Sequence, residues 1–113
     1  RKMPETDKVD ELRILINEWW ALLSPKEQRD CPLHTKNTPA SRRNLFWWVE
    51  AWLGDDLASV INGINYETGI REWVYQLTEP EYPHCMFSNA SRPIALMSAA
   101  IAKVKRMKEE NQP

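Results

Sequence analysis

The chain has 113 residues, the usual length of one domain and enough for a single hydrophobic core. With 42% hydrophobic and 27% charged residues it is typical of a globular protein, and its formal net charge of −1 gives no general attraction to nucleic acid or anionic membranes. No apolar stretch approaches the roughly 20 residues of a membrane span, and two cysteines are too few for a disulfide framework, so we expect a cytoplasmic protein.

The N-terminal part of the chain carries two patterns typical of helices. Residues 6–23 place apolar side chains at helical spacing on one face, and Thr6 at their start is a capping residue. Ser24 and Glu27 then form a capping box with a proline at the first helical position, which predicts a short helix over residues 25–30.

A third helix is expected between Pro39, a residue that favours the first helical position, and Gly54, a residue that favours a helix end. Its apolar face carries Trp48, whereas Trp47 falls on the opposite face, one turn after Arg43. The chain has six tryptophans, and each ring can bury on the order of 150–250 Å². Because a helix cannot point two neighbours in one direction, we expect one tryptophan of the pair to be left for contact with another molecule.

Two more helices are expected in the middle of the chain. Asp55 starts a short one that Gly63 ends, because three apolar side chains between them recur at helical spacing. Residues 66–77 have the same spacing and predict a fifth helix, capped by either Asn65 or Thr68.

The last helix is expected from Ser91 to about Lys108, and no segment shows the alternation of a half-buried strand. The predicted fold class is therefore all-α: a compact bundle of five or six short helices in a single domain, residues 1–113. Residues 1–6 and 109–113 are expected to be disordered tails.

All the cysteine and histidine of the chain lies in two clusters, Cys31 with His34 and His84 with Cys85. Two cysteines and two histidines are an acceptable tetrahedral zinc set, which would join the two predicted loops. Adjacent residues seldom both reach one metal, which argues against this structural zinc. The alternatives are buried thiols with hydrogen-bonded loop histidines, or a Cys31–Cys85 disulfide if the protein is exported.

The outer face of the third helix is the predicted partner-binding surface, formed by Arg42, Arg43, Trp47 and Glu50. Tryptophan and arginine are enriched at the energetic centres of protein interfaces. The alternative is that this face packs on another helix of the bundle.

A nucleic-acid-binding function is the alternative prediction. Arg42 and Arg43 would contact phosphates together with the basic end of the last helix, which carries Lys103, Lys105, Arg106 and Lys108. Cations at a helix C-terminus are also favourable in their own right, because they complement the helix dipole.

The sequence has no phosphate-binding glycine loop, no zinc-protease helix and no nucleophile elbow, so we expect no enzyme and no cofactor. The resulting prediction is a non-catalytic protein-interaction module, an adaptor or inhibitor of a larger macromolecular machine. Small accessory proteins of phages and other mobile elements are similar in size and composition. A homodimer is a further possibility, with Ile14 and Ala21 at the seam.

Overall fold

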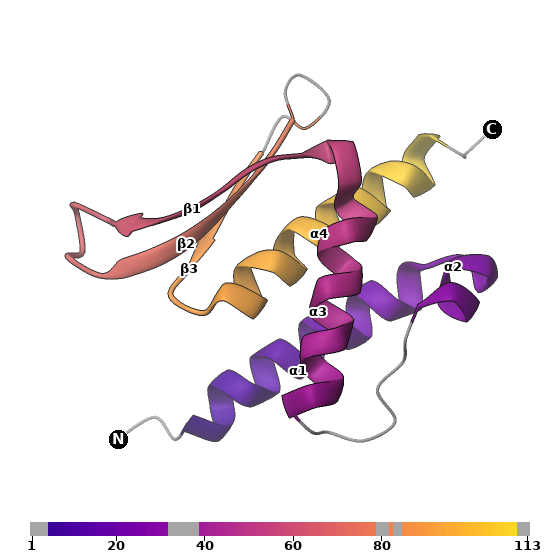
Figure 1. Cartoon of the computed structure of the whole chain (residues 1–113), viewed down its shortest axis with the longest axis horizontal. Coiled ribbons are helices and arrows are strands. Elements are labelled where there is room, and N and C mark those ends of the chain that lie inside the picture. The colour runs from indigo at the N-terminus through magenta and orange to yellow at the C-terminus, as the bar shows by residue number, and fades with distance from the viewer. Residues whose placement is uncertain (1–4, 32–38, 79–81, 83–84, 111–113) are drawn as a thin grey trace.

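The computed structural model describes residues 5–31, 39–78, 82 and 85–110. Along the chain these residues form the elements shown in Figure 1: α1 (Glu5–Leu22), α2 (Pro25–Asp30), α3 (Pro39–Leu53), the 3-10 turn η1 (Gly54–Asp56), β1 (Leu57–Ile64), β2 (Arg71–Leu77), β3 (Met86–Asn89) and α4 (Arg92–Glu110).

The fold is α+β, and the prediction of an all-α bundle is wrong. Three antiparallel strands form one sheet in the order β1-β2-β3. Val74 of β2 lies opposite Ile61 of β1 on one side and opposite Ser88 of β3 on the other. The two helices expected over 55–63 and 66–77 do not exist; β1 and β2 occupy those positions.

The other predicted helices are confirmed. In α2, Ser24 and Glu27 make both hydrogen bonds of the capping box. Gly54 directly follows α3 with a φ of 54°, the left-handed conformation that glycine adopts without strain. At the start of α4 the Ser91 hydroxyl accepts a hydrogen bond from the backbone N–H of Ile94. Both terminal helices extend into the segments that were expected to be disordered.

The error at β1 arises because a short apolar run fits both periodicities. Leu57, Val60 and Ile61 are spaced as on a helix face, but Val60 and Ile61 are β-branched and favour an extended strand. Gly63 does not end a helix; it lies inside the strand, opposite Glu72. The pairing with β2 decides between the two structures, and a single segment does not reveal that partner.

At the end of β2 burial follows the alternation of a strand: Tyr75 and Leu77 are fully buried, and Gln76 between them is only partly buried. Asn65, one of the two residues expected to cap a helix, instead closes the β1–β2 hairpin. Its side chain accepts a hydrogen bond from the backbone N–H of Glu67 at 2.9 Å. Gly69, with a φ of 73°, completes this turn.

The centre of the fold is α4. It packs against β2 and β3 on one side and against α1 on another, while α3 crosses beside it (Figure 1). Small side chains let these elements approach closely, so α4 is buried on more than one face. Its buried residues are Ile94, Ala95, Leu96, Met97, Ala99, Ala100, Ile101 and Val104.

Three tryptophans form the aromatic part of the core where α1 meets α3. Trp19 is fully buried, and its ring meets those of Trp48 and Trp52 edge to face, with centroids 6.0 and 5.7 Å away. The indole N–H of Trp52 donates to the Glu27 carboxylate at 2.8 Å, which ties α2 to this cluster.

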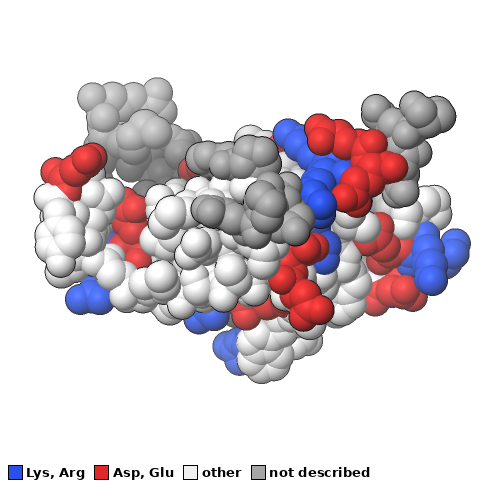
Figure 2. Space-filling view, turned by 90° about the horizontal axis from the view of Figure 1, so that it is seen from above, with Lys and Arg blue, Asp and Glu red and all other residues white. Residues whose placement is uncertain are grey.

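The sheet is covered unevenly, because α4 lies under β2 and β3 and leaves β1 projecting (Figure 1). Val60, Ile61 and Ile64 are between 37% and 51% exposed as a result. Figure 2 shows the molecule from above. The surface is largely uncharged in the left half of this view, and many of the acidic and basic side chains gather in the right half.

Candidate functional site

The outer face of α3 carries an indole that the core does not use. Trp47 is 65% exposed, whereas its neighbour Trp48 is half-buried against Trp19. The expected separation of the two adjacent rings is therefore confirmed. Arg43, one helical turn before Trp47, is exposed as well.

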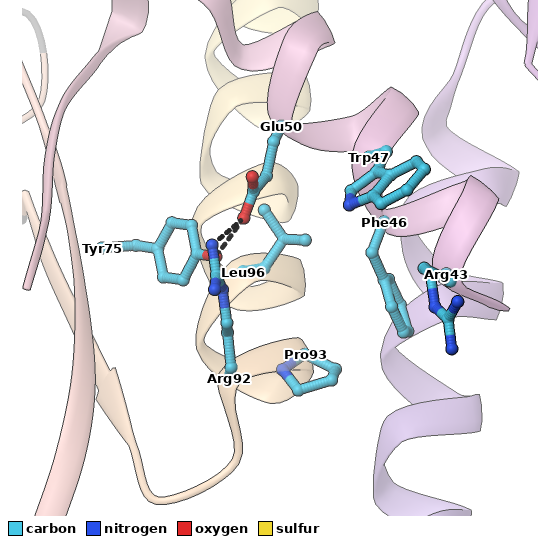
Figure 3. A pocket seen from close by; sticks show the side chains of 8 residues that line it. All are labelled: Arg43, Phe46, Trp47, Glu50, Tyr75, Arg92, Pro93 and Leu96. Carbon is cyan, nitrogen blue, oxygen red and sulfur yellow. Dashed lines mark hydrogen bonds and ion pairs between the residues drawn. The ribbon is translucent and has the colours of Figure 1, made fainter. Parts of the chain in front are cut away.

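Beside Trp47 lies a pocket of about 280 Å³ at the meeting point of three elements. Figure 3 shows Glu50, Tyr75 and Arg92 converging on one side and the other α3 side chains on the opposite side. The lining residues are Arg43, Phe46, Trp47 and Glu50 from α3, Tyr75 from β2, and Arg92, Pro93 and Leu96 from α4. Three of the four predicted contact residues thus border one concave site.

The polar side of this pocket is a network of three side chains. The Tyr75 hydroxyl donates a short hydrogen bond to the Glu50 carboxylate. Arg92 donates from Nε to the Tyr75 hydroxyl at 2.9 Å and from Nη2 to Glu50 Oε1 at 3.1 Å. The guanidinium also lies over the Trp73 ring, 4.5 Å from its centroid. These contacts join α3, β2 and α4 at the pocket wall.

Two members of the network, Tyr75 and Arg92, keep their protons at neutral pH. Burial of the Tyr75 hydroxyl raises its pKa to about 12, and the hydrogen bond to Glu50 acts in the same direction. The hydrogen bond to Tyr75 raises the pKa of Arg92, so that side chain keeps its charge. Tyr75 is therefore a neutral donor, and the Glu50 charge is balanced by Arg92.

The pocket consequently carries one surplus positive charge. Arg43 forms no hydrogen bond or ion pair with any residue that the structure describes, whereas Arg92 is engaged by Glu50. The remaining wall is apolar, made by Phe46, Leu96 and the Trp47 ring. Chemically, the site suits an apolar group next to an anion.

The four predicted contact residues have different places in this site. Trp47 and Arg43 point to solvent at the rim, while Glu50 is half-buried and bound to Tyr75 and Arg92. Arg42 belongs to α3, but its side chain lies outside the described residues.

The residues that β2 and α4 contribute, above all Tyr75 and Arg92, were not predicted from the sequence. Tyr75 was expected within a helix over 66–77, which concealed its inward direction. A strand over residues 71–77 would have revealed it, because Tyr75 then lies on the same face as Trp73 and Leu77. No local signal marks Arg92 as the partner of Glu50, since the two residues are 42 positions apart.

The basic residues of the nucleic-acid alternative do not form one open patch. Lys103 donates to the Trp52 and Leu53 carbonyls and pairs with Asp56 at 3.3 Å. It also lies 4.6 Å from the centroid of the Trp52 ring, so it acts within the fold as a cap for the C-terminus of α3.

The three other cations of that patch differ in their surroundings. Lys105 pairs with Glu18 at 3.6 Å, and Arg106 pairs with Glu110 at 2.9 Å and lies over the Tyr82 ring. Lys108 is exposed. Much of the positive charge is therefore neutralised by neighbours in the described part of the chain.

Of the predicted zinc ligands, His34 and His84 lie outside the described residues. Cys31 is buried, and burial raises the pKa of its thiol to about 11, which opposes the thiolate form that zinc requires. Cys31 and Cys85, both described, are not joined by a disulfide. The described residues contain no cluster of three or more cysteine, histidine or acidic side chains that could hold a metal.

Comparisons with protein-family models, with curated proteins and with solved structures found no match for the chain. Within the residues described, no helix is sufficiently long and apolar to cross a membrane. A functional assignment therefore has to rest on the pocket itself.

Proposed function

We propose that the protein is a non-catalytic protein-interaction module that binds its partner through the pocket beside Trp47. One observation carries this proposal: Trp47 is 65% exposed at the rim of a pocket that also holds Arg43, a cation with no hydrogen bond or ion pair to any described residue. Large aromatic rings and arginines in such surroundings are the residues that contribute most to binding energy in protein complexes.

The pocket favours a particular kind of partner segment, an apolar side chain next to a carboxylate. The apolar side chain would fill the space between Phe46 and Leu96, and the carboxylate would pair with Arg43 at the rim. Glu50 would not repel that carboxylate strongly, because Arg92 neutralises it at 3.1 Å.

The exposed indole supplies enough surface for useful affinity. Covering the 65% of Trp47 that is exposed removes on the order of 150 Å² from water. At about 25 cal/mol per Å² this stabilises a complex by roughly 3–4 kcal/mol before the costs of association. Trp47 would therefore be the anchor of the interface, and Arg43 would mainly set its specificity.

This proposal includes a cytoplasmic location, no catalytic activity and no cofactor. The low cysteine content and the absence of known catalytic motifs from the sequence support it. An adaptor or an inhibitor of a larger assembly is the role that such a binding module would have.

The test is a selection of random displayed peptides on the immobilised protein, followed by calorimetric titration of the enriched sequences. We expect enriched peptides to place an acidic residue within one or two positions of an aromatic or large aliphatic one. Trp47→Ala should weaken their binding by at least about thirtyfold, since truncating an anchor residue typically costs about 2 kcal/mol or more. Arg43→Gln should weaken binding less and reduce its salt dependence.

The matched control is Ile14→Ala, because Ile14 is 64% exposed, almost as exposed as Trp47, but lies on α1 away from the pocket. Its binding should equal that of the wild type. Failure to enrich any peptide, or equal affinity of the wild type and Trp47→Ala, contradicts the proposed function.

A further inference from the structure

The free edge of β1 is a second unsatisfied surface, separate from the pocket. Edge strands in natural proteins are usually short, charged or interrupted by proline, which prevents them from pairing with other chains. The other edge strand, β3, has four residues, whereas β1 has eight and contains no charged residue and no proline. No helix of the described structure covers β1 (Figure 1).

The register of the hairpin shows which backbone groups of β1 have no partner among the described residues. The backbone N–H of Asn65 donates to the carbonyl of Ile70 at 2.9 Å, so the backbone groups of Asn65 are directed toward β2. Because the direction of the backbone groups alternates along a strand, Ile61 and Gly63 also direct their backbone groups to β2. The N–H and C=O groups of residues 60, 62 and 64 therefore point away from the sheet.

We propose that a second copy of this chain pairs with this edge, β1 against β1, antiparallel about a two-fold axis through Asn62. In that register Asn62 faces Asn62 of the second copy, and Val60 faces Ile64 in both directions. All three facing pairs are of the type that exchanges two backbone hydrogen bonds, so every unpaired group named above finds a partner. The result is a continuous six-stranded sheet.

The side chains fit this arrangement. Val60 and Ile64, 37% and 51% exposed, would meet across the axis as a β-branched pair, a favourable cross-strand combination. Tyr66, which is 97% exposed, would lie opposite Ala58 of the second copy, a small exposed residue that leaves room for the ring. Since residues 57–66 carry no charge, no like charges meet along the shared edge.

The first test is disulfide cross-linking, which reads the register directly. Asn62→Cys should give a covalent dimer on mild oxidation, because the two substituted positions face each other across the axis. Ile64→Cys is the register control: position 64 faces position 60, so its two copies lie about 13 Å apart, beyond the reach of a disulfide. The wild type, which carries Cys31 and Cys85, is the blank, and peptide mapping identifies the joined positions.

The second test is sedimentation equilibrium up to the millimolar range. The wild type should rise from the monomer mass of 13.3 kDa toward twice that value. Val60→Lys should weaken this association about tenfold, since the two-fold axis repeats the change in two cross-strand pairs. Ile14→Lys, at the exposed α1 position, should leave it unchanged, and circular dichroism should show that both variants fold.

Three outcomes would overturn the proposal. They are a wild type that stays monomeric at all concentrations, a dimer that Ile14→Lys disrupts while Val60→Lys does not, and cross-linking of Ile64→Cys without cross-linking of Asn62→Cys. None of them bears on peptide binding at the pocket, so this inference and the proposed function fail independently.

Discussion

The two faces of α3 use the same residue types for different purposes. On the inner face, Trp48 and Trp52 close against Trp19, and Lys103 lies over the Trp52 ring while it caps the end of α3. On the outer face, Trp47 stands at the rim of the pocket with Arg43, which has no described partner. Composition alone does not distinguish a structural indole from a binding one. The distinction lies in whether the fold already covers the ring and satisfies the nearby charge.

The largest effect is expected for Trp19→Ala on the inner face. Trp19 is fully buried between α1 and α3, so truncation leaves a cavity and should lower the free energy of unfolding by about 3–5 kcal/mol. Urea denaturation followed by circular dichroism measures this. Trp19→Phe keeps a ring in place and should cost clearly less. A loss below 1 kcal/mol for Trp19→Ala would show that this cluster is not the core of the helical part.

The next effect is expected for Lys103→Met, which keeps the aliphatic stem and removes the charge. The Trp52 and Leu53 carbonyls then lose their donor and Asp56 loses its ion-pair partner. A loss of about 1.5–3 kcal/mol is expected from hydrogen bonds made by a charged group.

The control for Lys103→Met is Lys105→Met, two positions further along α4. Lys105 has an exposed ion pair with Glu18, with side chains 59% and 44% exposed, and such pairs contribute 0–1 kcal/mol. Equal losses in the two variants would contradict the role of Lys103 as a cap within the fold.

The sequence was sufficient for the features that local chemistry determines. The capping box of Ser24 and Glu27, the glycine that follows α3 and the opposite directions of Trp47 and Trp48 all depend on residues within a few positions of one another. For the same reason Arg43 and Trp47 could be expected on the outer face of the third helix, where both are exposed, although the concave site beside them was not predicted.

The features that were missed depend on distant partners. Leu57, Val60 and Ile61 fit a helix face as well as a strand, and only pairing with β2 selects the strand. Because β2 was not recognised, the contribution of Tyr75 to the pocket could not be foreseen. The Glu50–Arg92 ion pair joins α3 to α4, and the sequence of neither helix by itself indicates that these two residues pair.

A third prediction concerns Tyr75 of β2, which belongs both to the buried core and to the wall of the pocket. Its side chain is buried, and its hydroxyl donates a hydrogen bond to Glu50 in that wall. Tyr75→Phe removes a hydrogen bond to Glu50 and an acceptor for Arg92, and should cost about 1 kcal/mol at neutral pH. The side chain keeps its apolar volume, so the core should not relax.

The cost of Tyr75→Phe should also depend on pH. The pKa of Tyr75 is about 12 in the folded protein and 10.0 ordinarily, so below pH 10 both states keep the proton. As pH rises from 10 to 12, only the unfolded state releases it, and the stabilisation from Tyr75 is lost. The stability gap between wild type and Tyr75→Phe should therefore narrow over this range. Urea midpoints at pH 8, 10 and about 11 measure it, and a gap that widens would contradict the buried donor.

The smallest effect on stability is expected for Trp47→Ala. With 65% of the residue exposed and the neighbouring ring of Trp48 carrying the contact with Trp19, truncation should change the free energy of unfolding by only about 0.5 kcal/mol. The same substitution should have the largest effect on peptide binding, because it removes the anchor of the pocket. A stability loss approaching that of Trp19→Ala would mean that α3 has two structural faces, and the distinction between a covered and an available indole would no longer hold.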